Sequence, residues 1–551
     1  MSTASAEATP SVPRTAKAAQ GHTNVVGVLT RQAFRDTRIR TIAFGYLFAV
    51  YSYVQLVGYR HTYPTRADRL AFAGSFGSNT GLRLLYGQPH DLLTVSGYAA
   101  WRVGGVLAIA ASVFGLLAAV RALRAEEDSG RMEIVLAGVV SRLGANVAAM
   151  SAIAGGIVLL WLAEFAGLVL GGLPTAGAAY LALATASVAP VFVGIGALAS
   201  QLAPTRRGAL GLGAAVLGLM FVARVLADTV PGAGWLRWIT PLGWAELLRP
   251  FAGPQPFVLV LPAATTVLLL AASARLAADR DIGTGLLPAR DSADPRLRLL
   301  NSPTALGLRS QRGVLIASVS AAAALMFILG VVAHGISPAD IPQNVQNEIA
   351  KLGVGSIVTP TGYLAFLFML MTVAVSVLAC AQVGAARKDE ADQQLETLFA
   401  QPVGRARWLI GRLLLAAFSI AVVSLTGGLF AWMGATAAGV DIALPSMLEA
   451  GANAVPTSLL FLGVAVLAYA LFPRPSAGIA YGLLTIMFLW QLVGSLLGPP
   501  RWVLDLTPFA HVGLVPAQPL HTEAAIIIAA IGLLASGAAV VAFRRRDLTV
   551  G

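Results

Sequence analysis

Long apolar runs separated by short polar segments dominate this chain from residue 41 to residue 543. A helix needs about twenty mainly apolar residues to cross the hydrocarbon core of a bilayer, and these runs are long enough. The pattern therefore predicts an all-α polytopic membrane protein with about 12 transmembrane helices. The first six spans are expected near 41–59, 97–121, 144–172, 178–203, 208–228 and 256–278, and the second six near 313–335, 361–386, 407–437, 453–473, 476–497 and 523–543.

The segment before the first span divides into two parts. Residues 1–24 are rich in Ser, Thr, Ala and Pro and contain no apolar stretch of signal-peptide length, so we predict a disordered tail that is not cleaved. Residues 25–40 alternate apolar side chains such as Val26, Leu29 and Phe34 with arginines. This alternation predicts a helix that lies in the headgroup layer.

Composition supports the membrane prediction and sets the orientation. The mean hydropathy is +0.76, and 57% of residues are hydrophobic while 12% are charged. A net charge of +12 would favour nucleic acid as a partner of a soluble protein, but here the basic residues lie in short loops, so no nucleic-acid partner is predicted. Most of them fall on one side of the predicted spans, which places both termini in the cytoplasm. The excess of Arg over Lys is typical of high-GC bacteria, so we expect the bacterial cytoplasmic membrane.

One charged pattern occurs twice, at Glu126–Arg142 and at Asp389–Arg405. Glu133 in the first copy corresponds to Glu396 in the second, 263 residues later. In both copies the apolar residues recur at i, i+3 and i+4, which predicts a short amphipathic helix. Each copy lies between two predicted spans on the cytoplasmic side, where we expect it to contact a partner.

The duplication extends over most of the chain. Thr240-Pro241 recurs as Thr507-Pro508, and Arg280-Asp281 recurs as Arg546-Asp547, at spacings of 267 and 266 residues. Each of these Thr-Pro pairs lies in a segment rich in Trp and Pro that is too broken to span, which predicts a re-entrant or interfacial hairpin on the outer side. Each Arg-Asp pair follows the last span of its copy, where it serves at least as a stop signal at the inner leaflet.

The repeats predict the domain organisation. A first six-helix half at 25–285 and a second at 313–551 are joined by a cytoplasmic linker at 286–312. Because each copy has an even number of spans, the two halves are expected to be parallel in the membrane.

Charged residues at membrane depth are costly and point to function. Glu164, Arg102 and Arg224 fall within predicted spans of the first half, whereas the position equivalent to Arg224 in the second half is Gln491. One hypothesis is a substrate pathway in which Glu164, with Arg102 or Arg224, contacts a polar group of the substrate. The other is a structural ion pair between helices.

These motifs resemble the permease subunits of ABC exporters of the ABC-2 type. The duplicated twelve-span form is similar to the membrane component of tetronasin-type polyketide antibiotic and multidrug exporters of actinobacteria. The resemblance implies that each charged helix is a coupling helix that docks on one of two copies of a separate ABC ATPase, which binds ATP and Mg. The docking residues that it implies are Glu126, Glu127, Glu133, Leu136, Arg142, Asp389, Glu390, Glu396, Phe399 and Arg405.

The predicted function is the export of small hydrophobic or amphipathic compounds, such as antibiotics and drugs, across the lipid bilayer. None of the three lysines follows a Gly-rich loop, so we expect no ATPase site and no cofactor on this chain. The histidines lack metal-like spacing, so no metal site is expected. A proton-coupled twelve-span transporter that uses Glu164 is the alternative. A membrane-embedded transferase would need clustered loop carboxylates, which the sequence lacks.

Overall fold

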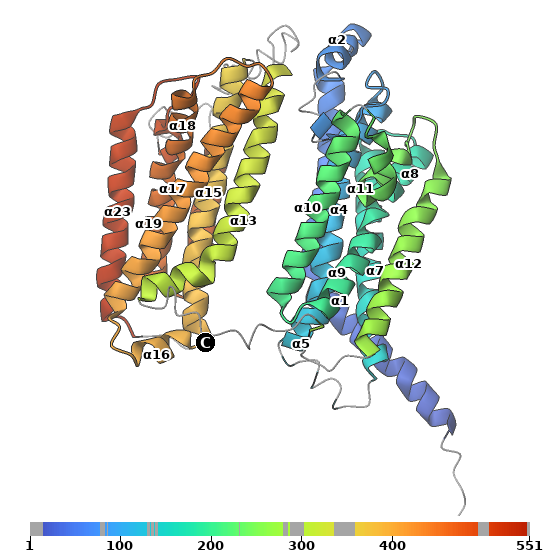
Figure 1. The fold of residues 1–551 in the computed structure, drawn as a ribbon, viewed down its shortest axis with the longest axis horizontal. Helices are drawn as coiled ribbons and strands as arrows, with labels where there is room; N and C mark the ends of the chain where they lie inside the picture. The colour runs from blue at the N-terminus through green and yellow to red at the C-terminus, as the bar shows by residue number, and fades with distance from the viewer. Residues whose placement is uncertain are drawn as a thin grey trace, which may run out of the picture. The chain divides into compact units, whose positions relative to one another are not determined.

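The computed structural model describes residues 15–77, 83–84, 86–128, 130, 133, 137, 141–230, 232–278, 285–286, 302–335, 359–493 and 506–547. Regular structure within these ranges is entirely helical (Figure 1), which confirms the all-α prediction. Eleven helices in the described ranges are long and apolar enough to span a membrane, and a shorter apolar stretch lies at Ser476–Phe488. The chain divides into two compact units, residues 1–69 with 83–292 and residues 70–82 with 293–551.

The first unit contains six long helical regions and a broken hairpin. Its elements are α1 (Thr15–Thr62), α2 (Arg66–Gly77, which extends into the second unit), α4 (Val95–Val120), the π-helix η1 (Arg121–Ala125), α5 (Glu126–Asp128), α7 (Arg142–Leu170), α8 (Thr175–Ala186), α9 (Val188–Leu202), α10 (Arg206–Thr229), the 3-10 helix η2 (Gly234–Ile239), α11 (Pro241–Leu247), η3 (Pro256–Leu259) and α12 (Val260–Ala278).

The second unit follows the same order. Its elements are α13 (Pro303–Val332), η5 (Ala333–Gly335), α15 (Pro360–Ala391), α16 (Gln394–Phe399), α17 (Arg405–Ala437), α18 (Leu444–Ala452), α19 (Ala454–Leu471), α20 (Ser476–Val493), α22 (Pro508–His511) and α23 (Thr522–Arg545).

Equivalent helices pack in the same pairs in both units. In the first unit α1 packs on α7, α4 on α9 and α12 on α9, and in the second α13 packs on α17, α15 on α19 and α23 on α19. The buried apolar side chains between these helices form several clusters in the first unit, one of them with Leu107 and Leu160, and a large cluster with Ile420 and Phe461 in the second. The two sequence repeats therefore correspond to two units with the same pairs of packed helices.

The fourth span of each unit is broken at the same place. Helix α8 gives way to α9 at Ser187, and α18 gives way to α19 at Asn453. Pro190 and Pro456 follow these breaks at equivalent positions. A proline removes one backbone donor and clashes with the preceding turn, so each chain of hydrogen bonds is interrupted there.

Two glycines let the first and third spans of each unit approach closely. A Cβ atom on Gly167 of α7 would meet the backbone of Ala49 in α1, and one on Gly434 of α17 would meet the backbone of Phe327 in α13. Small residues allow helix backbones to pack at short range within membranes, where burial of apolar surface offers little driving force.

The start of the chain differs from the sequence prediction. Residues 25–40 do not form a separate helix before the first span, because α1 runs without interruption from Thr15 to Thr62. Part of the predicted disordered tail, residues 15–24, belongs to this helix, while residues 1–14 lie outside the described ranges. The arginines of 25–40 do not prevent a continuous helix because arginine is a good helix former.

Candidate functional site

A network of two arginines and two carboxylates joins α10 to the broken hairpin formed by η2 and α11. Arg224 Nη1 lies 3.2 Å from Glu246 Oε1, and Arg237 Nε lies 2.7 Å from Asp228 Oδ1. Arg224 and Asp228 are almost fully buried. Each carboxyl group has a guanidinium partner, which compensates for its removal from water. The network holds the hairpin against the end of α10.

The sequence alone predicts only part of this network. It indicates Arg224 as a residue of the substrate pathway, but it does not indicate Glu246 or Arg237 of the hairpin. Their one sequence signal is that each is a charged residue within a Trp- and Pro-rich segment between two spans.

The backbone at Leu84 and Gly87 lies against the same network. Arg224 also donates a hydrogen bond to the carbonyl of Leu84, and Trp101 Nε1 donates to the carbonyl of Gly87 over 2.8 Å. Gly87 has a φ of +86°, and a Cβ there would collide with the Glu246 carboxylate. Glycine is required here both for the backbone conformation and for space.

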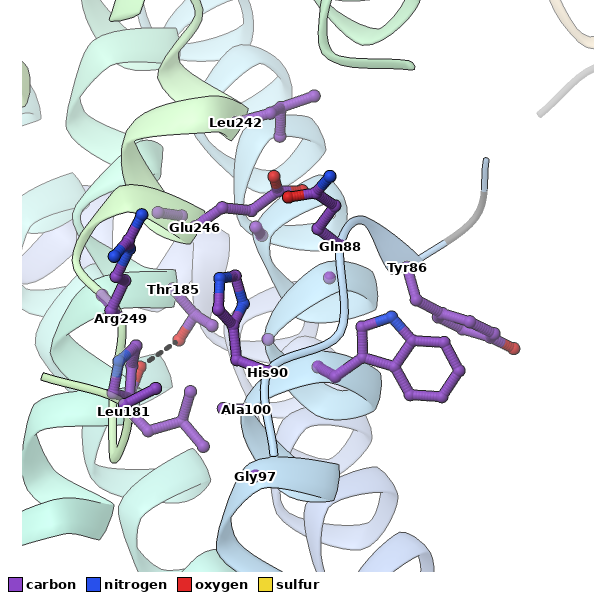
Figure 2. A pocket seen from close by; sticks show the side chains of 18 of the residues that line it. Tyr86, Gln88, His90, Gly97, Ala100, Leu181, Thr185, Leu242, Glu246 and Arg249 are labelled. Atoms are coloured by element: carbon purple, nitrogen blue, oxygen red, sulfur yellow. Dashed lines mark hydrogen bonds between the residues drawn. The ribbon is translucent and has the colours of Figure 1, made fainter. Parts of the chain in front are cut away.

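A small polar cavity of about 50 Å³ lies beside the network. Figure 2 shows Gln88, His90, Thr185, Glu246 and Arg249 around it, together with apolar residues of α4 and α8. Drug-sized ligands need pockets of roughly 300–1,000 Å³, whereas a water needs about 10–15 Å³. In this conformation the cavity has room for a few waters only.

Burial sets the electrostatics of this cavity. It raises the pKa of Glu246 to about 8, although the guanidinium of Arg224 acts in the opposite direction. Burial, with the nearby charge of Arg249, lowers the pKa of His90. Both shifts favour neutral side chains facing the cavity.

Glu164 lies directly behind the cavity wall. It is fully buried, and Thr185 Oγ1 donates a 2.5 Å hydrogen bond to its Oε2. Its other oxygen has no hydrogen-bond partner among the described residues, and neither Arg102 nor Arg224 forms an ion pair with it there. The hypothesis that Glu164 pairs with Arg102 or Arg224 is therefore wrong for this conformation, because the hairpin supplies other partners for Arg224.

Arg102 and Gln491 have different surroundings. The Arg102 guanidinium lies over the ring of Tyr86, 4.5 Å from its centroid, and bonds to the Tyr51 hydroxyl. Gln491 Oε1 accepts a 2.8 Å hydrogen bond from Thr507, which also caps α22. The second unit thus joins its fifth span to its broken hairpin through a neutral hydrogen bond, where the first unit uses charges.

The first predicted coupling segment begins with a buried ion-pair cluster. Arg124 is almost fully buried and lies 2.9 Å from Glu127 and 3.1 Å from Asp128. It also bonds to the carbonyl of Pro204, and Asp128 accepts a 2.7 Å bond from the backbone N–H of Arg206. This cluster joins the end of α4 to the start of α10.

The remaining predicted residues of this segment are only partly described. Glu126 is half-buried, Glu133 is exposed and Arg142 begins α7. Leu136, with most of 129–140, lies outside the described residues.

The second coupling segment is fully described and is anchored by Glu390. This carboxylate is 5% exposed and accepts two hydrogen bonds from Arg546 Nη2, of 2.8 and 2.7 Å, and one of 2.6 Å from the Tyr469 hydroxyl. Arg405 donates to the carbonyl of Arg546 over 2.6 Å, and Asp389 pairs with Arg412. The ends of α15, α17, α19 and α23 are joined here.

The apolar stripe of the second segment faces its own unit. Leu395 is buried, and the Phe399 ring packs edge-on against Trp408 with centroids 5.9 Å apart. Glu396 is exposed on α16. Glu396 of α16 is thus exposed, whereas Glu390 and Phe399 contact other residues of the second unit, Arg546 and Trp408.

Together these features define an all-α, multi-pass membrane protein built from two units of one plan. A family model described as "Multidrug efflux system permease Rv1217c, C-terminal domain" matches residues 73–276 and 300–544. The chain is 31% identical over 552 residues to the multidrug efflux system permease protein Rv1217c of Mycobacterium tuberculosis (strain ATCC 25618 / H37Rv), covering 98% of each chain. It therefore belongs to the Rv1217c-like family of multidrug efflux permeases.

Proposed function

We propose that this chain is the membrane-spanning permease subunit of an ATP-driven ABC exporter in the bacterial cytoplasmic membrane, with both termini in the cytoplasm. It exports small hydrophobic or amphipathic compounds from the cytoplasm or the inner leaflet. Two copies of a separate ABC ATPase dock on 126–142 and 389–405, and ATP and Mg bind to those subunits. The chain itself has no phosphate-binding loop and serves as the transport pathway.

The observation that carries this proposal is the anchoring of α16 to several spans. Glu390 at the end of α15 bonds to Arg546 after α23 and to Tyr469 at the end of α19. Arg405, which begins α17, bonds to the same Arg546. A force applied to the exposed side of α16 would therefore move four span ends together, as coupling between a docking site and a membrane pathway requires.

We also infer a division of roles among the docking residues. Exposed acids such as Glu133 and Glu396 are available to a partner, whereas Glu127 and Glu390 are bound within the chain. We assign contact with the ATPase to the exposed acids and transmission of movement to the buried ones.

The test is assembly with the ATPase subunit encoded by a neighbouring gene. We expect the two proteins to copurify and to hydrolyse ATP only together. Glu396→Lys should weaken the complex because it reverses a charge on the exposed face of α16. Glu449→Lys is the matched control, since Glu449 is also exposed but lies at the opposite end of the second unit. Failure of the wild-type chain to bind the ATPase would contradict the proposal, as would an equal effect of the two variants.

A second candidate function is proton-coupled export with Glu164 as the carrier. It is favoured by the burial of this carboxyl group without a cationic partner in the described residues. The two functions differ in energy source. Transport by proteoliposomes that contain the chain alone, driven by a proton gradient and abolished by Glu164→Gln, would establish the second and exclude the first.

A further inference from the structure

Two arginines of the first unit line one cavity without neutralising partners. They are Arg40 of α1 and Arg121 of η1. Neither side chain forms an ion pair or hydrogen bond with a described residue, and the positive charge of Arg206, the first residue of α10, also acts on Arg40. Guanidinium groups from separate elements repel one another, so their proximity favours a bound anion.

The arginines flank a groove with an apolar floor. One cavity of about 40 Å³ is lined by Arg40 and Arg121 together with Phe44, Phe114 and Ile153. A second cavity of about 150 Å³ continues between the N-terminal part of α1, η1 and the start of α7. The two cavities share Thr37 and Arg121, so they form one groove that passes from charged to apolar surroundings.

The groove lies at the lipid-facing side of the unit. Leu117, which lines the narrow cavity, is 40% exposed, and Ile42 on the adjacent turn of α1 is 66% exposed. A ligand in the groove would therefore have its charged end at the arginines and its apolar part along the surface that contacts acyl chains. The wider cavity also contains Asp36 and Glu126, neither of which pairs with Arg40 or Arg121.

We propose that this groove binds an anionic phospholipid, with the phosphate held by Arg40 and Arg121 and one acyl chain along Phe44, Phe114 and Leu117. Guanidinium groups bind phosphate oxygens through paired, charge-assisted hydrogen bonds. Basic pockets between membrane helices are suited to acidic headgroups. The bound lipid neutralises the two arginines and joins α1 to η1. This site is independent of the transport function proposed above.

The experiment measures lipid binding by the purified full-length chain, without an ATPase. The delipidated protein is titrated in detergent with dioctanoyl phosphatidylglycerol, dioctanoyl phosphatidylcholine and dioctanoylglycerol, and binding is followed by native mass spectrometry and thermal shift. We expect saturable binding of the anionic lipid, weaker binding of the choline lipid and none of dioctanoylglycerol. Equal binding of all three would overturn the proposal.

Variants locate the site. Arg40→Gln combined with Arg121→Gln should weaken phosphatidylglycerol binding by about tenfold or more, because charge-assisted hydrogen bonds are lost. Arg35→Gln combined with Arg38→Gln removes the same charge from positions of α1 that line neither cavity and should leave binding unchanged. Arg121→Lys keeps the charge and should lose less than Arg121→Gln. If the control double variant weakened binding as much as the double variant in the groove, the lipid would be binding to basic surface in general, and the proposal would be wrong.

Discussion

Glu390 and Arg546 are 156 positions apart in the chain and are joined by two hydrogen bonds at one end of the second unit. Glu127, the equivalent of Glu390 in the first unit, is held instead by Arg124, three residues before it. Equivalent carboxylates are thus buried in both units but have partners on different elements. In the second unit the ion pair joins the end of α15 to the residue that follows α23. In the first unit both members of the pair lie in η1 and α5, directly after α4.

Removing the carboxylate of Glu390 should destabilise the second unit. Glu390→Gln leaves the buried face of Arg546 without a counter-charge, and breaking such a pair costs about 3 kcal/mol or more. We expect a lower unfolding temperature in detergent and loss of transport. Glu396→Gln is the control, because the same chemical change is made on an exposed residue of α16. Equal unfolding temperatures for the two variants would show that the buried pair contributes little.

Arg224 should be more important than its counterpart Gln491. Arg224→Gln removes the guanidinium group that lies against both Asp228 and Glu246, so both buried carboxyl groups lose this partner. We expect reduced amounts of protein in the membrane, with partial recovery in Arg224→Lys. Gln491→Ala removes one neutral hydrogen bond, worth about 1 kcal/mol, and should leave the amount of protein nearly unchanged. The comparison is made by quantitative immunoblotting of membranes.

Replacing Glu164 and replacing Thr185 should affect stability to different extents, because the two residues share one hydrogen bond. Glu164→Gln can still accept the Thr185 hydrogen bond through its amide oxygen, so the unfolding temperature should stay within a few degrees of the wild type. Thr185→Val leaves a buried carboxyl group without its partner, which costs about 1–3 kcal/mol. A larger loss of stability in Glu164→Gln than in Thr185→Val would contradict the observed geometry.

Close helix packing at Gly434 should not tolerate a larger side chain. Gly434→Leu forces α17 away from the backbone of Phe327, and overpacking of this kind costs about 1–3 kcal/mol. Gly384→Leu is the matched control in a neighbouring span, because nothing lies within 4 Å of its Cβ position. Thermal unfolding monitored by size-exclusion chromatography compares the two, and similar losses would indicate that the close approach is unimportant.

Stability should depend on pH through Glu246. Its pKa is raised to about 8 in the folded protein from 4.5, chiefly by burial, so the folded state binds more protons than the unfolded state between these values. The free energy of unfolding must then fall as pH rises through this window. We expect the unfolding temperature of the wild type to decrease more steeply from pH 5 to pH 8 than that of Glu246→Gln. Parallel pH profiles would assign the dependence to other groups.

Hydropathy alone determined the all-α membrane class and most of the spans, because a bilayer fixes the length and polarity of any segment that crosses it. The duplicated motifs predicted the repeat as well. Thr240-Pro241 and Thr507-Pro508 recur in the sequence, and in the structure each threonine caps a short helix that starts with its proline. The sequence also marked Glu164, Arg102 and Arg224 as buried charges.

Only the tertiary structure decided which of these charges meet. Arg224 binds Glu246 of the hairpin while Glu164 binds Thr185, and Glu390 binds Arg546, which follows the last helix of the unit. The physical reason is that periodicity assigns a residue to a helix face, whereas partners across helices depend on the depth and rotation at which separate spans pack. Those quantities are set by contacts such as Gly167 with Ala49 and Gly434 with Phe327, which no local pattern in the chain encodes.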